Sequence, residues 1–315
     1  MATWPGLQYY QIGAGIRTQY GIVHPPGEGH VYFVKSTQIN DNYELERRRL
    51  PKLNDALNQC KDGRGDRVYV LEGHTEDVAV ATFLSNLKEG VSIIGCGDVN
   101  RDTAPTFSYT ATGALWNITK KNVTISGIVL KPGINNVSNM LSFSVGGCSV
   151  LGCRFVVGTA SSVKFVNMLN VDGGANNLRI AGNLWQATGS ATCASAIRTG
   201  GVADGVHITD NIFAIETAAA GDGAIEIAHA DTGLFILRNY FDNYLATGQK
   251  AIDFTDVAAS GMVAHNVIHV RADGAAASNR GIVIAGTTNL QVGFVENYVT
   301  DEKGKSGILN PAAAT

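Results

Sequence analysis

The chain has 315 residues, of which 24 are basic and 27 acidic, so its formal net charge is −3 at pH 7. Hydrophobic residues make up 45% and charged residues only 16%, a balance that excludes a charged coiled coil and a disordered chain. Without a basic surplus or an apolar run of roughly 18 residues, neither nucleic acid nor a membrane is expected as a partner. The first residues lack the pattern of a secretory signal, which favours assembly in the cytoplasm.

Residues 1–29 are rich in aromatic and proline residues and almost without charge. This segment is too short to bury its own aromatic side chains. We therefore predict an extended N-terminal arm that docks on another protein surface, because exposed aromatic residues are typical of interfaces. The residues predicted to bind are Trp4, Tyr9, Tyr10 and Tyr20.

Residues 30–90 are predicted to form a small α+β region. Residues 30–35 and 67–71 alternate as strands do, and residues 43–60 carry apolar residues at helical spacing, interrupted by Pro51. We expect this region to cap the coils that follow, because an uncovered sheet end leaves backbone groups unpaired.

A repeat of about 28 residues organises residues 91–315. Its motif is apolar, any residue, turn residue, Asn, any residue, large apolar, as in the run from Ile180 to Trp185. Counted at the Asn position from residue 128 to residue 297, the steps are 25, 30, 28, 28, 27 and 31 residues. The Asn column consists of Asn183, Asn211, Asn239, Asn266 and Asn297.

An aliphatic column with the same period lies between the copies of the motif. Short strands separated by Gly, Asn and Ala at this period are typical of a parallel β-helix, an all-β solenoid in which each coil pairs with the next. Leucine-rich repeats have similar lengths, but their characteristic leucine pattern is absent. The aliphatic column consists of Leu115, Leu141, Leu169, Ile197, Ile225, Ile252, Ile282 and Ile308.

Stacking of the coils at roughly 4.8 Å gives the Asn column a physical role. At a tight bend, an inward Asn donates its amide to one coil and accepts a backbone N–H from the next. Each Asn also tolerates the left-handed conformation that such a bend needs. The residue two positions after each Asn, such as Trp185 or Phe213, is expected to fill the core.

The residues one position after each Asn are mostly apolar and are expected to point outward. Such a row predicts a surface for assembly with other chains. The alternatives are a change of alternation at the bend and a loop that covers the row. We call the following residues the apolar ridge: Leu184, Ile212, Tyr240, Val267 and Tyr298.

Charged residues follow the aliphatic column on three successive coils, as Arg198, Glu226 and Asp253. One interpretation is an acid/base pair of carboxylates for cleaving a glycosidic bond, with the arginine assisting. The other is a ladder of opposite charges on an exposed sheet. The same face is predicted to hold Asp172, His229 and Asp256.

Cysteines and histidines give no indication of a metal or another cofactor. The five cysteines lack paired ligand spacing and are expected to be buried as free thiols. His265 and His269 would lie about 13 Å apart along a strand, too far to share a metal ion. The tripeptide Arg64-Gly65-Asp66 is interpreted as a turn rather than an adhesion motif.

The coil motif resembles the right-handed parallel β-helix superfamily of pectate lyases and phage tailspikes. The resemblance covers about residues 91–310 and implies the fold, which hosts both enzymes and inert structural proteins. The calcium-binding Asp cluster and Arg-x-Pro-x-x-Arg strand of pectate lyases are missing. The Asn-Thr-Asp, Asp-Asp and Gly-His-Gly signatures of polygalacturonases are missing too, which argues against an enzyme.

Residues 30–35 and 63–76 look like parts of proteins encoded in tailed-phage virion gene clusters. In that group, β-helices serve as trimeric capsid decoration proteins or as tail proteins. The resemblance implies a non-enzymatic homotrimer on the capsid surface, bound to the major capsid protein through its N-terminal arm. The alternatives are a tailspike-type enzyme that cleaves a surface polysaccharide with Glu226, Asp253 and Arg198, and a carbohydrate-binding adhesin.

Overall fold

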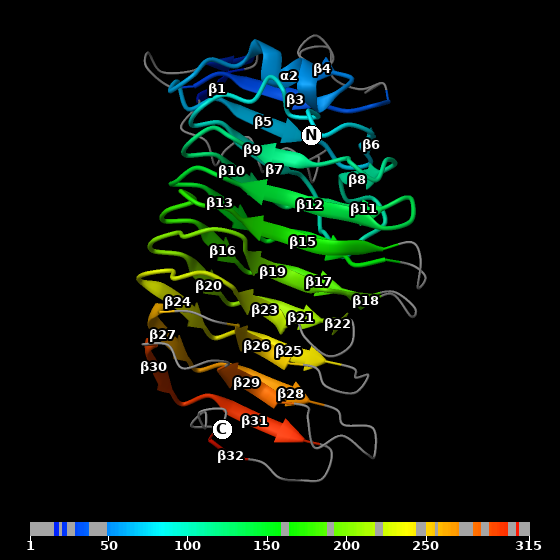
Figure 1. Cartoon of the computed structure of the whole chain (residues 1–315). Helices are drawn as coiled ribbons and strands as arrows, with labels where there is room; N and C mark the ends of the chain where they lie inside the picture. Colours follow the sequence, from blue (N-terminus) through cyan, green and yellow to red (C-terminus); the bar gives the residue numbers. More distant parts are fainter. Residues whose placement is uncertain are drawn as a thin grey trace.

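The computed structural model is a β-solenoid whose coils stack along one axis (Figure 1). Three parallel sheets form its sides, and each complete coil passes from sheet 1 to sheet 2 to sheet 3. The aromatic residues of the predicted arm, Trp4, Tyr9, Tyr10 and Tyr20, lie outside the described residues. The structure describes residues 16–18, 21–23, 29–37, 49–158, 164–187, 192–217, 223–243, 250–255, 258–270, 280–284, 290–301 and 307–308.

The elements fall into three large sheets and a few short additions. Sheet 1 contains β3 (Val31–Val34), β4 (Arg49–Leu50), β5 (Arg67–Val70), β7 (Ser92–Gly95), β10 (Thr124–Ser126), β13 (Ser149–Leu151), β16 (Arg179–Ala181), β20 (His207–Thr209), β24 (Leu234–Leu237), β27 (Ser260–Ala264) and β30 (Gln291–Val295). Sheet 2 contains β6 (Thr75–Val78), β8 (Thr106–Tyr109), β11 (Val129–Pro132), β14 (Arg154–Val156), β17 (Leu184–Gln186), β21 (Ile212–Ala214), β25 (Tyr240–Asn243), β28 (Val267–Val270), β31 (Tyr298–Asp301) and β32 (Gly307–Ile308). Sheet 3 contains β9 (Trp116–Ile118), β12 (Val137–Phe143), β15 (Phe165–Val171), β19 (Ser195–Thr199), β23 (Gly223–Ile227), β26 (Lys250–Phe254) and β29 (Arg280–Ile284). The additions are α2 (Leu53–Gln59), the hairpin β1 (Ile16–Thr18) and β2 (Gly21–Val23), and the pair β18 (Thr192–Cys193) and β22 (Glu216–Thr217).

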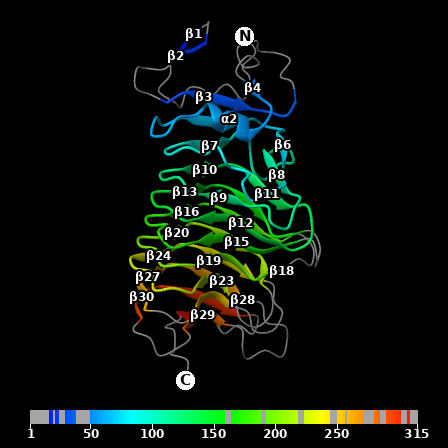
Figure 2. The same ribbon diagram turned by 45° about the horizontal axis from the view of Figure 1, so that its top comes forward.

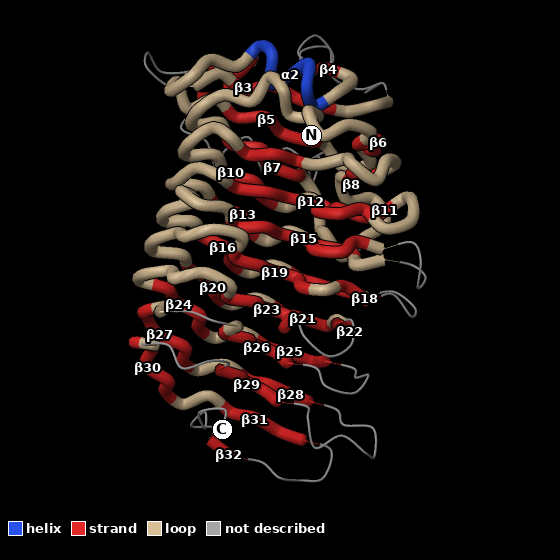
Figure 3. The backbone as a smooth tube through the Cα atoms, in the orientation of Figure 1, coloured by secondary structure: helices blue, strands red, loops and turns tan. Residues whose placement is uncertain are grey.

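Successive coils pair in parallel and in the register set by the repeat. Arg179 lies opposite His207, and His207 opposite Phe235, so equivalent residues stack. Strands form the sides of the solenoid and loops connect them at its edges (Figure 3). The prediction of an all-β parallel solenoid with about 28 residues per coil is confirmed.

The interior is a continuous stack of apolar side chains. Phe155, Trp185, Phe213 and Phe241 lie face to face, with ring centroids 4.0, 5.7 and 4.7 Å apart and planes within 8° of parallel. All four side chains are fully buried, as expected for the residue two positions after the Asn column. Burial of each such side chain contributes roughly 1.5–3 kcal/mol to folding.

The Asn column forms a ladder of hydrogen bonds at the corner between sheets 1 and 2. The Asn183 side chain accepts the Cys153 N–H at 2.9 Å and donates to the Val150 carbonyl at 3.0 Å. The Asn211 side-chain oxygen then accepts both the backbone N–H and the side-chain amide of Asn183, at 3.0 and 2.9 Å. The same pattern continues through Asn239, Asn266 and Asn297.

The left-handed residue of this corner is the one before each Asn, so the tolerance of Asn for this conformation is not used. The φ angle is +65° at Gly182, +58° at Asp210, +54° at Arg238 and +56° at His265. Placing the turn one residue earlier lets the Asn side chain face inward, where it reaches both neighbouring coils.

Strands of sheet 3 turn two consecutive residues toward the core. These are Ala196 and Ile197 in β19, and Ala251 and Ile252 in β26, all fully buried in one cluster. At Gly281 of β29, an added Cβ would meet core side chains of sheet 2. Residues that flank such a pair, three positions apart, can therefore share the outer face of the sheet.

Two members of the predicted aliphatic column are placed differently by the structure. Trp116, not Leu115, lies opposite Leu141, and it is fully buried against Phe107, with ring centroids 4.8 Å apart. The larger side chain fills the core, which shifts the register of β9 by one residue. Ile308 lies in β32, antiparallel to β31, and is not part of sheet 3.

The N-terminal region joins the solenoid sheets. β3 pairs in parallel with β5, and β5 with β7, so sheet 1 runs through the predicted boundary at residue 91. β6 likewise extends sheet 2 beyond β8. The region 30–90 is therefore continuous with the coils in its hydrogen bonding.

Helix α2 lies across the N-terminal end of the solenoid (Figure 2). It begins at Leu53, just after Pro51, and buries Leu53, Ala56 and Leu57 in the core. Glu76 of β6 accepts the Leu53 N–H at 2.9 Å, which satisfies one free donor of the helix start. Within the described residues, no helix is long and apolar enough to cross a membrane.

Candidate functional site

The outer surface of sheet 3 carries a row of polar side chains along the solenoid. Register pairing places Ser142, Asn170, Arg198, Glu226 and Asp253 on successive coils. Further polar residues beside the row bond to its members. We call the whole set the polar face: Ser142, Asn170, Asp172, Ser195, Arg198, Glu226, Lys250 and Asp253.

Glu226 lies at the centre of the polar face, between an arginine and a serine. Its Oε2 is 3.3 Å from Nε of Arg198 and accepts the Ser195 hydroxyl at 3.0 Å. The Glu226 side chain is 8% exposed, whereas that of Arg198 is 45% exposed. The buried Glu226 carboxylate is thus fixed by the Ser195 hydroxyl, while its partner Arg198 reaches solvent.

Asp253 lies opposite Glu226 on the next coil and is fully buried. Lys250, three residues earlier on the same strand, places its Nζ 2.6 Å from Oδ2 of Asp253. Gly223 makes this packing possible, because an added Cβ there would lie 3.0 Å from the Asp253 Cβ. The contact between Arg198 and Glu226 is a cross-strand ion pair of the kind that the charge-ladder interpretation expects, but both carboxylates are buried rather than on an exposed sheet.

A second polar cluster, around the carboxylate of Asp172, lies toward the N-terminal end of the polar face. Asp172 accepts the hydroxyl of Ser142 and, at 2.6 Å, the side-chain amide of Asn170. His229, which was predicted for this face, lies instead in the turn with Asp231. Asp256 falls outside the described residues.

The polar face presents to solvent the amide of Asn170, the carboxylate of Asp172, the guanidinium of Arg198 and the ammonium of Lys250, whereas its serines, Glu226 and Asp253 are buried. Such a row can exchange hydrogen bonds with a hydroxyl-rich polymer that lies along the axis. Glu226 and Asp253 are adjacent, but each is neutralised by a cation, so neither is presented as a free acid or base. Lys250 and Ser195 were missed in the sequence. The signal was their position three residues before Asp253 and Arg198, respectively.

The apolar ridge lies on the outer surface of sheet 2. Ile212, Tyr240, Val267 and Tyr298 are 46, 41, 41 and 45% exposed, and Leu184 is half-buried. Strand pairing places all five on successive coils. The ridge therefore runs unbroken over the C-terminal half of the solenoid.

The earlier part of the same row is covered by the chain itself. Val129 packs against Ala104, Val156 and Val99, and only 6% of it is exposed. Arg154 donates to the Val99 carbonyl at 3.4 Å. A loop from the first coils thus shields the row where it begins, and the ridge starts where that loop ends.

The histidines singled out in the sequence pair with separate acids. His265 Nδ1 lies 3.1 Å from Glu296, and His269 Nδ1 lies 3.4 Å from Asp242. Within the described residues, no group of three or more His, Cys, Asp or Glu side chains could hold a metal ion. All five cysteines are free thiols.

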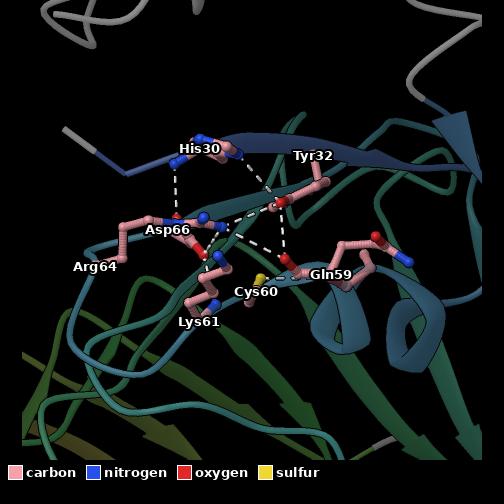
Figure 4. A network of polar contacts seen from close by, with 8 residues as sticks. His30, Tyr32, Gln59, Cys60, Lys61, Arg64 and Asp66 are labelled. Carbon is pink, nitrogen blue, oxygen red and sulfur yellow. Dashed lines mark hydrogen bonds and ion pairs between the residues drawn. The ribbon is translucent and has the colours of Figure 1, made fainter. Parts of the chain in front are cut away.

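Arg64 and Asp66, the charged residues of the Arg-Gly-Asp tripeptide, belong to a polar network near α2 (Figure 4). Asp66 is fully buried and accepts the N–H groups of His30 and Lys61 at 2.7 and 2.8 Å. Two nitrogens of Arg64 also bind its carboxylate, each at 2.6 Å. Arg64 reaches the Tyr32 hydroxyl as well, which donates to the Gln59 carbonyl at the end of α2. Through Arg64, the tripeptide connects the end of α2 at Gln59 with Tyr32 of β3 in sheet 1.

The sequence matches no protein-family model and no curated protein. Among solved structures, the chain is similar to ORF18 of Geobacillus virus E2, with 12% identity and a TM-score of 0.32. The match covers 79% of this chain and 57% of that protein, so the chain spans little more than half the length of the neighbour.

Proposed function

We propose that the chain is a structural virion protein of a tailed phage, a capsid decoration protein that forms a trimer and attaches through its N-terminal arm. The observation that carries the proposal is the apolar ridge, which is exposed on four successive coils of a rigid body. Contiguous exposed apolar residues mark surfaces for assembly. The major capsid protein is the proposed partner of the arm, and the capsid surface its location.

Two properties of the molecule support a structural role over catalysis. The core is continuous from α2 to the last coils, which gives a stiff rod that resists unfolding. Two of the three carboxylates of the polar face, Glu226 and Asp253, are paired with Arg198 and Lys250. A rod with an assembly ridge along one side suits attachment to a particle.

Deletion of residues 1–29 tests the attachment. The full chain should sediment with phage capsids that lack it, whereas the shortened chain should remain in solution with its oligomeric mass unchanged. Tyr240→Glu in the ridge should lower the oligomeric mass. It leaves the arm intact, so each chain should still be able to bind the capsid. Capsid binding by the shortened chain at full strength would contradict the proposal.

The second candidate is a tailspike-type protein that binds or cleaves a surface polysaccharide on the polar face. The hydrogen-bonding row along sheet 3 favours it, because coils about 4.8 Å apart can follow a linear glycan. Glu226 and Asp253 would then act as the acid/base pair, with Arg198 assisting.

Incubation of the purified protein with host capsular or lipopolysaccharide tests this candidate. Glycan cleavage that is abolished in Glu226→Gln, but kept in the matched control Glu296→Gln, whose side chain is 70% exposed away from sheet 3, would support the enzyme. Binding without cleavage that is lost in Arg198→Ala would support an adhesin. Neither binding nor cleavage would leave the structural role standing and exclude this candidate.

A further inference from the structure

The two ends of the solenoid are closed to different degrees. At the N-terminal end, α2 covers the first coil, and Leu57, Val34 and Val68 are fully buried. At the C-terminal end, four hydrophobic residues of the last coil are only partly buried against the core, although three of them lie opposite fully buried residues of the preceding coil. These partly buried residues are Ile284, Val292, Phe294 and Val299.

Two of the three sheets end there in a strand with a described neighbour on one side only. These strands are β30, beside β27, and β29, beside β26, whereas sheet 2 is extended by the antiparallel β32. Gln291 donates its N–H to the carbonyl of Ala259, just before β27, and the Val295 carbonyl accepts the N–H of His265, just after β27. Because backbone groups alternate in direction along a strand, those of Val292 and Phe294 point along the axis, away from the solenoid.

Strand β30 lacks the features that usually protect an edge. Its five residues, Gln291–Val295, include no charge and no proline. The edge strand at the other end, β4, has only two residues and carries Arg49. Long uncharged edges are the ones that pair with another chain, since charge, proline and short length are the common means of preventing it.

We propose that the C-terminal end of the solenoid is a self-association surface, where β30 pairs antiparallel with β30 of a second copy across a two-fold axis. Head-to-tail stacking would have to displace α2 from the N-terminal end, whereas a two-fold axis makes this end complementary to itself and closes the assembly. The rotation also brings together the partly exposed ends of the two cores. This contact uses neither the arm nor the ridge.

Native mass spectrometry of the full chain tests the proposal. With the trimer proposed above, the assembly should be a hexamer of two trimers joined at their C-terminal ends, and in every case should contain an even number of chains. Val292→Lys should halve its mass by placing a charge at the shared edge. Val202→Lys is the matched control, because Val202 is 51% exposed in a turn away from this end, and its mass should equal that of the unmodified protein. An odd number of chains, or an unchanged mass in Val292→Lys, would overturn the proposal.

A cysteine crosslink keeps the test independent of folding defects in Val292→Lys. In an antiparallel pair centred on β30, the two copies of Gly293 form a non-hydrogen-bonded pair with their Cα atoms about 4.5 Å apart, within the range of a disulfide. Oxidised Gly293→Cys should therefore run as a covalent dimer on a non-reducing gel, and the exposed control Asn117→Cys as a monomer. A monomer from both variants would overturn the proposal. So would protection of the β30 amides in a strictly monomeric protein, because the chain's own C-terminal residues would then cover the edge.

Discussion

Two fully buried aspartates differ in how their surroundings change the carboxyl pKa. These are Asp66 beside α2 and Asp231 in the turn between sheets 3 and 1. Burial alone would raise the pKa of Asp66, but the Arg64 hydrogen bonds and two backbone N–H groups outweigh it, and the pKa is lowered. At Asp231, burial dominates over the Ala203 N–H and raises the pKa to about 6. Among the described residues, Oδ2 of Asp231 accepts no hydrogen bond.

The difference shows that the supply of donors, rather than depth, decides what a buried polar group does for stability. Asp66 accepts from four donor groups, three of them supplied by Lys61 and Arg64 in the same turn and the fourth by the distant His30. Asp231 stands 28 residues from Ala203 and meets mainly that residue's backbone N–H. In the Asn ladder the buried side chains are the best supplied with hydrogen-bond partners, because each Asn provides the acceptor that the preceding Asn needs.

Asn211→Ala should have the largest effect, since it interrupts the hydrogen-bonded Asn ladder. It removes the acceptor of two donors of Asn183 and leaves the Ile180 carbonyl without its donor. Each buried group that loses its partner costs about 1–3 kcal/mol, so the free energy of unfolding should fall by about 3–5 kcal/mol. Chemical denaturation measures it, with the exposed Asn117→Ala as control. A loss below about 1 kcal/mol would contradict the ladder.

Asp66→Asn should come next, with a loss of about 2–4 kcal/mol, because it leaves Arg64 beside a neutral partner. The pKa of Asp66 is lowered in the fold, so its contribution is present above the ordinary carboxylate pKa and disappears as the pH falls through the folded pKa. The variant should therefore show a weaker loss of stability on acidification. Parallel stability curves for the two proteins below pH 5 would refute this.

Asp231→Asn should act in the opposite direction and stabilise the protein by about 2 kcal/mol at neutral pH. The folded pKa of about 6 lies above the unfolded value, so stability falls as the pH rises between them and the cost is complete above 6. Asn keeps an acceptor for the Ala203 N–H and removes the charge. Denaturation at pH 4.5 and 7.5 checks the sign, since the gain should be clearly smaller at the lower pH.

The smallest expected effects concern the left-handed residue before each Asn. Gly182→Ala should lose about 1 kcal/mol, because its φ of +65° disfavours a Cβ. His265→Gly should be neutral or slightly stabilising, since it relieves the same strain at φ +56°. Thermal unfolding of both variants tests the pair. Equal losses in the two would show that conformation is not what this position selects.

The sequence predicts the solenoid well because its evidence is repeated. Five Asn residues at one period leave few alternatives, and the inward aromatic stack follows from strand alternation. The register of β9 was harder, because Leu115 and Trp116 are both apolar and only packing distinguishes them. The left-handed positions are hidden wherever Arg238 or His265 replaces the glycine that usually marks them.

The polar face and the buried aspartates depend on information that a repeat does not carry. Burial of Glu226 and Asp253 follows from how the small residues beside them pack. Asp231 occurs once, and a single polar residue in a turn gives no sign that it is enclosed. The network around Asp66 joins residues up to 36 positions apart, so no local pattern reveals it.

Hydrogen exchange at the backbone amides of the Asn column tests most directly that like residues of successive coils bind one another. The amides of Asn183, Asn211 and Asn239 each donate to the next Asn side chain, at about 3.0 Å. They should exchange only through global unfolding, and Asn211→Ala should release the Asn183 amide while the Asn239 amide stays protected. Rapid exchange at these corners in the unmodified protein, as in an ordinary surface turn, would contradict the stacked solenoid.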